Sequence, residues 1–350
     1  MVLLILRWAH SETALQATTQ LRMTLYIFMQ MTGGMLAKRR FMSQLMVILS
    51  ILILSPFTDV VQHEVHNMNN PKLLVSTDWL AKHLNDENLR IVDIRGHVLP
   101  ATEPPPHYFN HADDYAQSHI PNAIFIDWVH EITDPNDPRH ARIASPECFT
   151  GVMRRLGLNS TTQVVAYDDA NGMFAARLWW ALNYYGHHQV AVLDGGWQKW
   201  IAEKRPTTNI IPQITPTDIQ AVPDARWIYD DEQVLAALNT DTVLLDVRSE
   251  AEFLGQASRA ARAGHIPNAI NLPRSELIDA NGMMLSPELL RQKLHQLGLT
   301  NSDQKIVTYC NSGVSASYGL LALKIAGYEN SALFDGSWKA WGNDFTKPIA

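Results

Sequence analysis

Near its C-terminal end the chain reads YCNSGVSAS at residues 309–317. The segment before it, KIVTY at 305–309, is short, apolar and β-branched, which predicts a buried strand. The segment after it, YGLLALKIA at 318–326, predicts a helix that ends near Gly327. A cysteine therefore stands at the C-terminal end of a strand, in a tight loop of small residues that leads into a helix.

The loop around Cys310 has the composition of an anion-binding turn. Small residues, with Gly313 among them, allow successive backbone N–H groups to turn toward the sulfur, and the start of a helix adds its positive end. We expect this setting to lower the pKa of the thiol from its usual value of about 8.5 and to populate a nucleophilic thiolate. The alternative is a buried cysteine that only fills the core.

Two further features limit the chemistry. The second cysteine, Cys148, lies at a polar helix start (residues 145–149) with no comparable loop, so we assign it a structural role. Protein tyrosine phosphatases carry a Cys-x5-Arg loop whose guanidinium binds the phosphoryl oxygens. Here Ala316 occupies the position of that arginine and Ser317 follows it, which disfavours phosphoryl transfer.

Composition places the chain among globular proteins with two domains or more. It has 350 residues, of which 46% are hydrophobic and 18% charged. The net charge of −7 and the lack of a basic run in the folded part argue against nucleic-acid binding. The two distant cysteines do not form a disulfide framework, no Cys/His cluster has metal-ligand spacing, and no metal or organic cofactor is implied. Among the scattered histidines, we expect the pair His187 and His188 on the surface.

Residues 1–70 differ from the rest of the chain. KRR at 38–40 followed by LMVILSILIL at 45–54 has the form of the charged and apolar regions of a signal segment. The apolar run is short for a transmembrane helix, and no small-x-small cleavage pattern follows it. The alternative is that translation starts at Met35 or Met68. We favour this alternative and expect a cytoplasmic protein, or an exported or membrane-anchored one if the 38–54 segment is a genuine signal.

From residue 73 onward, strand-like and helix-like segments alternate. We expect strands at 89–95, 124–126, 163–168 and 189–193, helices at 77–84 and 175–185, and a Pro-rich loop through 104–106. Short strands that alternate with helices predict a parallel sheet covered by helices on both faces.

The second part of the chain repeats the first. VDIR at 92–95 returns as LDVR, HIPNAI at 119–124 returns as the same letters at 265–270, and VLDGGWQKW at 192–200 returns as LFDGSWKAW at 333–341. Three segments in register indicate a duplicated α/β domain. In this register Asp168 stands where the second copy has Cys310, so only one domain has kept the thiol.

The repeat sets the domain boundaries. We place an uncertain N-terminal extension at 1–70, the first domain at 71–205, a linker at 206–225 and the catalytic domain at 226–350. The linker is rich in proline and β-branched residues, which favours an extended segment on the surface.

These segments resemble the two-domain rhodanese-type sulfurtransferases across residues 73–350. The paired HIPNA segments, the DGGW and DGSW segments and the six-residue loop from Cys310 to Ser315 carry the resemblance. It implies two rhodanese folds, an active site in the cleft between them and catalysis by the C-terminal copy.

Within that family the loop distinguishes two substrate classes. Members that prefer thiosulfate resemble CRKGVT, whose cations suit a dianion, whereas members that act on 3-mercaptopyruvate resemble the uncharged CGSGVT. Here the loop reads CNSGVS, so the resemblance implies the 3-mercaptopyruvate type, with thiosulfate as the alternative donor. Asn311 in place of glycine and Ser315 in place of threonine are departures from the pattern.

The resemblance also implies roles for the loop residues. Cys310 attacks the sulfur of the donor, holds it as a persulfide and passes it to cyanide, a small thiol or a reduced thioredoxin-like protein. Ser312 assists proton handling on the substrate. Backbone N–H groups stabilise the sulfur anion, and the substrate-binding positions are Asn311, Gly313, Val314 and Ser315.

Three roles are implied for the first domain. His119 and Asp114, or Asp113 in its place, support catalysis, although His119 also fits a turn-stabilising role in its repeated motif. Arg177 matches the arginine that binds the substrate carboxylate. A second arginine is common six positions further on, where this chain has Asn183.

Two acid–arginine pairs, Asp93 with Arg95 and Asp246 with Arg248, fit a structural role in which each ties a strand end to a neighbouring loop. A rival to the enzyme is a rhodanese module that only binds a partner. That rival predicts a lost thiol or a broken loop in both copies, whereas Cys310 and Gly313 are intact.

Overall fold

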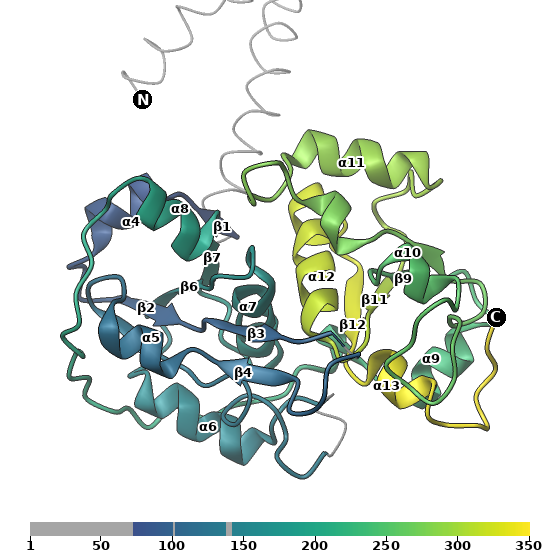
Figure 1. The fold of residues 1–350 in the computed structure, drawn as a ribbon, viewed down its shortest axis with the longest axis horizontal. Coiled ribbons are helices and arrows are strands. Elements are labelled where there is room, and N and C mark those ends of the chain that lie inside the picture. The colour runs from purple at the N-terminus through teal and green to yellow at the C-terminus, as the bar shows by residue number, and fades with distance from the viewer. Residues whose placement is uncertain (1–72, 101, 138–141) are drawn as a thin grey trace, which may run out of the picture. The chain divides into compact units, whose positions relative to one another are not determined.

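The computed structural model describes residues 73–100, 102–137 and 142–350 of the chain (Figure 1). The predicted leader at 38–54 and the alternative starts at Met35 and Met68 lie outside the described residues. None of the helices in the described part is long and apolar enough to span a membrane.

A five-stranded parallel sheet organises the N-terminal half. The strand order is β1-β7-β6-β2-β5, and every neighbouring pair is parallel. The strands are β1 (Leu74–Val75), β2 (Leu89–Asp93), β5 (Ala123–Phe125), β6 (Gln163–Tyr167) and β7 (Val190–Leu193). The helices are α4 (Thr77–His83), α5 (Ala112–Gln117), α6 (Pro146–Arg155), α7 (Met173–Tyr184) and α8 (Gly196–Ala202).

The C-terminal half has the same topology. Its order is β8-β12-β11-β9-β10, so each strand takes the place of its counterpart in the first sheet. The strands are β8 (Ile228–Tyr229), β9 (Val243–Asp246), β10 (Ile270–Asn271), β11 (Ile306–Tyr309) and β12 (Ser331–Phe334). The helices are α9 (Asp231–Ala237), α10 (Glu250–Phe253), α11 (Pro287–Gln296), α12 (Val314–Ala326) and α13 (Ser337–Trp341), with short 3-10 turns η1 (Ala225–Trp227) and η2 (Arg274–Leu277). The predicted duplication of a parallel α/β domain is confirmed.

The central strands are apolar because both faces of each sheet are covered. Along β6, Val164 and Ala166 belong to one buried cluster, and Val165 and Tyr167 belong to another on the opposite face. This alternation is the period of two that side chains follow along a strand. Continuous apolar strands of this kind are typical of parallel sheets buried on both sides.

Helices α7 and α12, which follow the two corresponding loops, pack against each other at the contact between the halves (Figure 1). Both are apolar around most of their circumference, and one buried cluster includes residues of both. A helix that is apolar all round must be buried, and this contact buries it. Helix α12 begins at Val314, earlier than predicted, because the small residues at 314–317 are already helical.

An antiparallel hairpin that the sequence did not predict, β3 (Gly96–Val98) with β4 (Tyr108–Asn110), encloses the Pro-rich loop. It reaches the C-terminal half, where Arg259 Nη2 donates to the carbonyl of Leu99 at 2.9 Å and Lys339 Nζ donates to the hydroxyl of Tyr108.

The predicted linker, residues 206–225, contains no helix or strand before η1 begins at Ala225, and it forms hydrogen bonds with the N-terminal half. Thr217 N donates to Arg154 O at 3.2 Å, and Arg154 Nε donates to Ile219 O at 2.9 Å.

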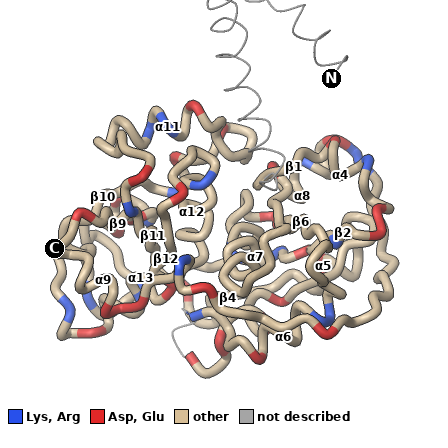
Figure 2. The backbone as a smooth tube through the Cα atoms, turned by 180° about the vertical axis from the view of Figure 1, so that it is seen from behind, with Lys and Arg blue, Asp and Glu red and all other residues tan. Residues whose placement is uncertain are grey.

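Lysines and arginines are interspersed with acidic residues over the described part of both halves (Figure 2).

Candidate active site

Cys310 directly follows β11, and the loop of residues 310–315, here called the thiol loop, carries the chain into α12. Gly313 is the N-cap of that helix with φ of 78°, in the left-handed region that favours glycine. A Cβ at this position would lie 2.8 Å from Arg177 Nη1 and 2.9 Å from Asp335 Oδ1. Both the backbone conformation and the close neighbours therefore require glycine.

A serine outside the thiol loop holds it from behind. Ser337 Oγ accepts the N–H groups of Cys310 and Gly313, each at 3.1 Å, and donates to Phe334 O at 2.9 Å. Ser337 has φ of 52°, an unfavourable conformation for a residue with a Cβ. The hydroxyl thus fixes both ends of the turn that contains the sulfur.

The thiol itself is almost enclosed. Cys310 is 4% exposed, and burial raises the pKa of its thiol, although the backbone N–H groups of Ser312 and Ala316 act in the opposite direction. The predicted lowering of the thiol pKa is therefore wrong, because desolvation of the thiolate outweighs the N–H groups. Cys148, in contrast, is exposed on α6, so its thiol does not fill the core.

The corresponding loop of the first half contains its own anion. Asp168 Oδ1 accepts the N–H groups of Ala170 at 2.8 Å and Gly172 at 2.9 Å, and its Oδ2 accepts the N–H of Ala175 at 2.8 Å. This loop has the same position between a strand and a helix as the thiol loop. Loops of this shape can therefore surround an anion with backbone donors, and the second copy offers that environment to a sulfur.

A cavity of about 330 Å³, here called the thiol pocket, opens over Cys310 between the halves. The C-terminal half contributes the thiol loop and charged side chains, and the N-terminal half contributes the hairpin and the start of α7. The lining residues outside the loop include Val98, Tyr108, Met173, Arg248, Glu252, Arg259 and Arg274.

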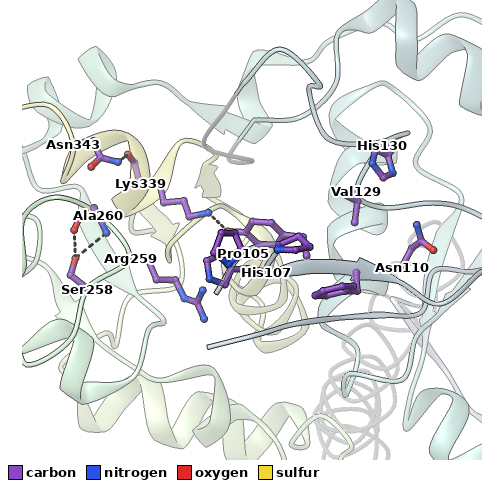
Figure 3. A pocket seen from close by; sticks show the side chains of 13 residues that line it. Pro105, His107, Asn110, Val129, His130, Ser258, Arg259, Ala260, Lys339 and Asn343 are labelled. Carbon is purple, nitrogen blue, oxygen red and sulfur yellow. Dashed lines mark hydrogen bonds between the residues drawn. The ribbon is translucent and has the colours of Figure 1, made fainter. Parts of the chain in front are cut away.

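A wider cavity of about 1070 Å³, the outer pocket, adjoins the thiol pocket through the shared residues Tyr108 and Arg259. Figure 3 shows Lys339 and Arg259 entering it from the C-terminal half, with His130 on the far side. Burial lowers the pKa of Lys339 to about 8. The outer pocket thus combines apolar side chains such as Phe109 and Val129 with the cationic side chains of Arg259 and Lys339.

The structure brings most of the predicted loop residues together. Besides Cys310, the thiol pocket is lined by Asn311, Ser312, Val314 and Ser315. Asn311 Nδ2 donates to Glu252 Oε1 at 2.8 Å, so its side chain is held against α10. Ser315 Oγ lies 3.3 Å from Met173 Sδ of the other half.

Arg177 is not among the residues that line the thiol pocket. Its guanidinium is 3% exposed, its Nη1 lies 2.6 Å from Asp335 Oδ1, and its Cζ stacks 4.5 Å over the ring of Trp180. The second oxygen of Asp335 accepts the N–H of Ile143 at 2.8 Å. In this arrangement Arg177 joins the two halves. Asn183, at the position of the second arginine, is buried and donates to Trp179 O at 2.9 Å.

His119 and Asp114 also lie away from the thiol pocket. His119 is fully buried, with Nδ1 at 2.7 Å from Tyr115 O and Nε2 at 3.1 Å from Ile210 O. Both ring nitrogens thus contact backbone carbonyls, as the turn-stabilising interpretation requires. Asp114 and its neighbour Asp113 are exposed on the first turn of α5.

The sequence did not indicate Arg259, Arg274 or Glu252 as pocket residues. One available signal was the repeat register, which aligns Arg274 with Trp128 of the first copy. Trp128 is 2% exposed in the core, whereas Arg274 faces a cavity. When one copy has a cation at a position where the other copy has a core side chain, packing within the domain does not explain the cation.

Two other predictions have clear outcomes. Arg95 and Arg248 pair with Asp93 and Asp246 at 2.9 and 2.6 Å and donate to the carbonyls of neighbouring loops, so their structural role is confirmed. His187 is 4% exposed rather than on the surface. No group of three or more His, Cys, Asp or Glu side chains in the described residues is placed to hold a metal ion.

Comparison with known proteins adds independent findings. Two segments, residues 76–203 and 230–344, match the model of the rhodanese-like domain. The chain is 35% identical to the sulfur carrier protein TtuD of Thermus thermophilus, over 80% of this chain and 97% of that protein. It is 35% identical to the putative thiosulfate sulfurtransferase SseA of Mycobacterium bovis, over 80% and 91% respectively. The crystal structure of SseA from Escherichia coli, a 3-mercaptopyruvate sulfotransferase, is 30% identical with a TM-score of 0.67, and the match covers 76% of this chain and 99% of that one.

Proposed function

The chain belongs to the rhodanese-like family of sulfurtransferases, and from this premise we propose that it transfers sulfur from 3-mercaptopyruvate through a persulfide on Cys310. The observation that carries the proposal is the pair of corresponding loops. One surrounds the carboxylate of Asp168 with backbone N–H groups, and the other places a thiol in the same environment beside a cavity.

The reaction proceeds in two displacements. The Cys310 thiolate attacks the donor sulfur, an S–S bond forms, the C–S bond breaks, and the pyruvate enolate leaves and takes up a proton. A thiolate or cyanide then attacks the outer sulfur, the S–S bond breaks, and the Cys310 thiolate is restored. The N–H groups of Ser312 and Ala316 stabilise sulfur anions in both steps.

The remaining loop residues shape the site. Ser312, which is 9% exposed at the pocket wall, assists the transfer of a proton to the enolate. Asn311, held by Glu252, narrows the mouth without adding charge to the loop. The outer pocket gives the acceptor, a small thiol or the cysteine of a thioredoxin-like protein, a route to the persulfide.

Thiosulfate is the second candidate donor, and one observation favours it. The thiol loop is uncharged, but Arg259 and Arg274 place two guanidinium groups in the same cavity. Two cations suit a dianion, as thiosulfate is. The relative from Mycobacterium bovis carries a thiosulfate sulfurtransferase name.

Steady-state sulfur transfer to cyanide with both donors in parallel tests the proposal. We expect kcat/KM to favour 3-mercaptopyruvate by about tenfold or more, which corresponds to about 1.4 kcal/mol of transition-state preference. Parity or a preference for thiosulfate would replace 3-mercaptopyruvate with the second candidate. Cys310→Ser should abolish transfer from either donor, whereas Cys148→Ser, which removes the exposed thiol, should retain it. Full activity of Cys310→Ser would exclude the persulfide mechanism, and inactivity of the wild type would favour a binding module.

A further inference from the structure

Arg274 is a charged residue of the thiol pocket that the proposed mechanism does not yet use. It is the first residue of η2, directly after Pro273, and it lines the same cavity as Cys310. Its guanidinium is near enough to Asp168, Tyr318 and Cys310 for their charges to influence it. Its Nη1 also lies 3.4 Å from Ala170 O, so the side chain extends from the thiol pocket to the corresponding loop of the first half.

The other arginines near the site already have partners. Arg248 forms a buried pair with Asp246 at 2.6 Å, and Arg177 lies 2.6 Å from Asp335. Arg259 donates to the carbonyl of Leu99 at 2.9 Å. An arginine in such an arrangement has part of its hydrogen-bonding capacity committed to the protein.

Arg274 differs from them. Its hydrogen bond to Ala170 O is long, at 3.4 Å, and no carboxylate of the described residues lies within salt-bridge distance of it. The ring of Tyr318 lies 5.5 Å from its Cζ and supports one face of the guanidinium. Burial lowers the pKa of Arg274 because it disfavours the charged guanidinium, and a bound anion would offset this desolvation cost.

We propose that Arg274 binds the carboxylate of the keto-acid donor and orients its sulfur toward Cys310. This inference rests on the proposed function, because it assigns the recognition of the same substrate. The planar fork of a guanidinium matches a carboxylate with two parallel hydrogen bonds, which fixes direction as well as position.

The geometry favours Arg274 over Arg177 for this role. Arg177 could reach a ligand only by leaving Asp335, whose carboxylate would then remain buried without its counter-charge. The repeat supports the same assignment: the position of Arg274 holds the core residue Trp128 in the half that lacks the thiol. The arginine is present only where the nucleophile is present.

Two donors that differ only in the carboxylate test this inference. 3-Mercaptopyruvate carries the group, and mercaptoacetone has a methyl group in its place. In Arg274→Gln we expect kcat/KM for 3-mercaptopyruvate to fall by about 30-fold or more, as the loss of a charge-assisted interaction predicts, with little change for mercaptoacetone. Arg274→Lys, which keeps the charge without the fork, should recover part of the loss. The activity on mercaptoacetone also shows that each variant is folded.

The outcomes separate the inference from the proposed function. If the wild type does not discriminate between the two donors, carboxylate recognition is absent and the inference is overturned. If Arg274→Gln leaves the ratio of the two kcat/KM values unchanged while Arg177→Gln lowers it, Arg177 is the carboxylate ligand and the inference is also overturned. Failure of the proposed function appears instead in the wild type, as a preference for thiosulfate over 3-mercaptopyruvate.

Discussion

The hydroxyl of Ser337 lies 3.1 Å from the backbone nitrogen of Cys310 and accepts its N–H. Ser337 adopts φ of 52°, and its counterpart in the first copy is Gly196 with φ of 53°. In the first copy the carboxylate of Asp168 itself accepts the N–H groups of its loop, so a glycine is sufficient at this position. In the second copy the thiol loop needs the hydroxyl of Ser337 as an acceptor. Ser337 therefore adopts an unfavourable backbone conformation at a position where its hydroxyl orients the nucleophile.

Ser337→Gly should lower kcat/KM for sulfur transfer by about tenfold, because two buried N–H groups lose their acceptor and the loop loses its fixed shape. The glycine accepts the left-handed conformation, so the change removes the hydroxyl without adding backbone strain. Steady-state kinetics and the rate of Cys310 alkylation measure the effect. Ser331→Ala is the matched control, since Ser331 Oγ is buried and donates only to Tyr328 O. An equal loss in the control, or activity of Ser337→Gly within about twofold of the wild type, would contradict a positioning role.

The pH dependence of sulfur loading should follow the Cys310 thiol. Because burial raises the pKa of this group, the thiolate is a minor species near neutral pH in the free enzyme. The rate of alkylation by iodoacetamide, measured in Cys148→Ser, should therefore rise about tenfold per pH unit through the neutral and mildly alkaline range. A rate that is already constant below neutral pH would show a lowered thiol pKa instead.

The ion pair between Arg177 and Asp335 should stabilise the fold. Arg177→Met leaves a buried carboxylate without its cation, and we expect a loss of about 3 kcal/mol in the free energy of unfolding. Urea denaturation measures the change. Arg226→Met is a suitable control, because Arg226 is 84% exposed in its pair with Asp224, and it should cost less than about 1 kcal/mol. Similar losses of unfolding free energy in the two variants would show that the pair of Arg177 and Asp335 does not stabilise the contact between the halves.

The sequence predicted the fold well because the relevant signals are local or repeated. Apolar runs placed the strands, small residues placed the turn at Cys310, and the repeat register gave two equivalent domains. The site was predicted only as far as the thiol loop extends along the chain. Two features of the site depend on how the halves pack: the buried ion pair between Arg177 and Asp335, and the position of Arg259 and Arg274 in the thiol pocket. Neither composition nor spacing reveals this packing.

The expected sign of the Cys310 pKa shift failed for a related reason. The loop donors that lower the pKa can be inferred from small residues at a helix start. The desolvation that raises it comes from burial of the sulfur in the folded chain, which depends on the tertiary structure. The loop sequence alone therefore does not predict the direction of the pKa shift of a buried nucleophile.

The stability of the protein should decrease in mild acid through His187. Burial lowers the pKa of His187 from 6.5 to about 4, so the folded state keeps the ring neutral where the unfolded chain already binds a proton. The stabilisation from the neutral ring is complete above pH 6.5 and is lost progressively as the pH falls toward 4, to a total of about 3 kcal/mol. In His187→Gln the free energy of unfolding, measured in urea across this range, should fall less steeply with decreasing pH than in the wild type. His188→Gln, which changes the exposed neighbouring ring, should alter the slope less than His187→Gln, because burial contributes more than the His188 charge to the lowered pKa of His187. An unchanged slope in His187→Gln would show that other groups cause the loss of stability in acid.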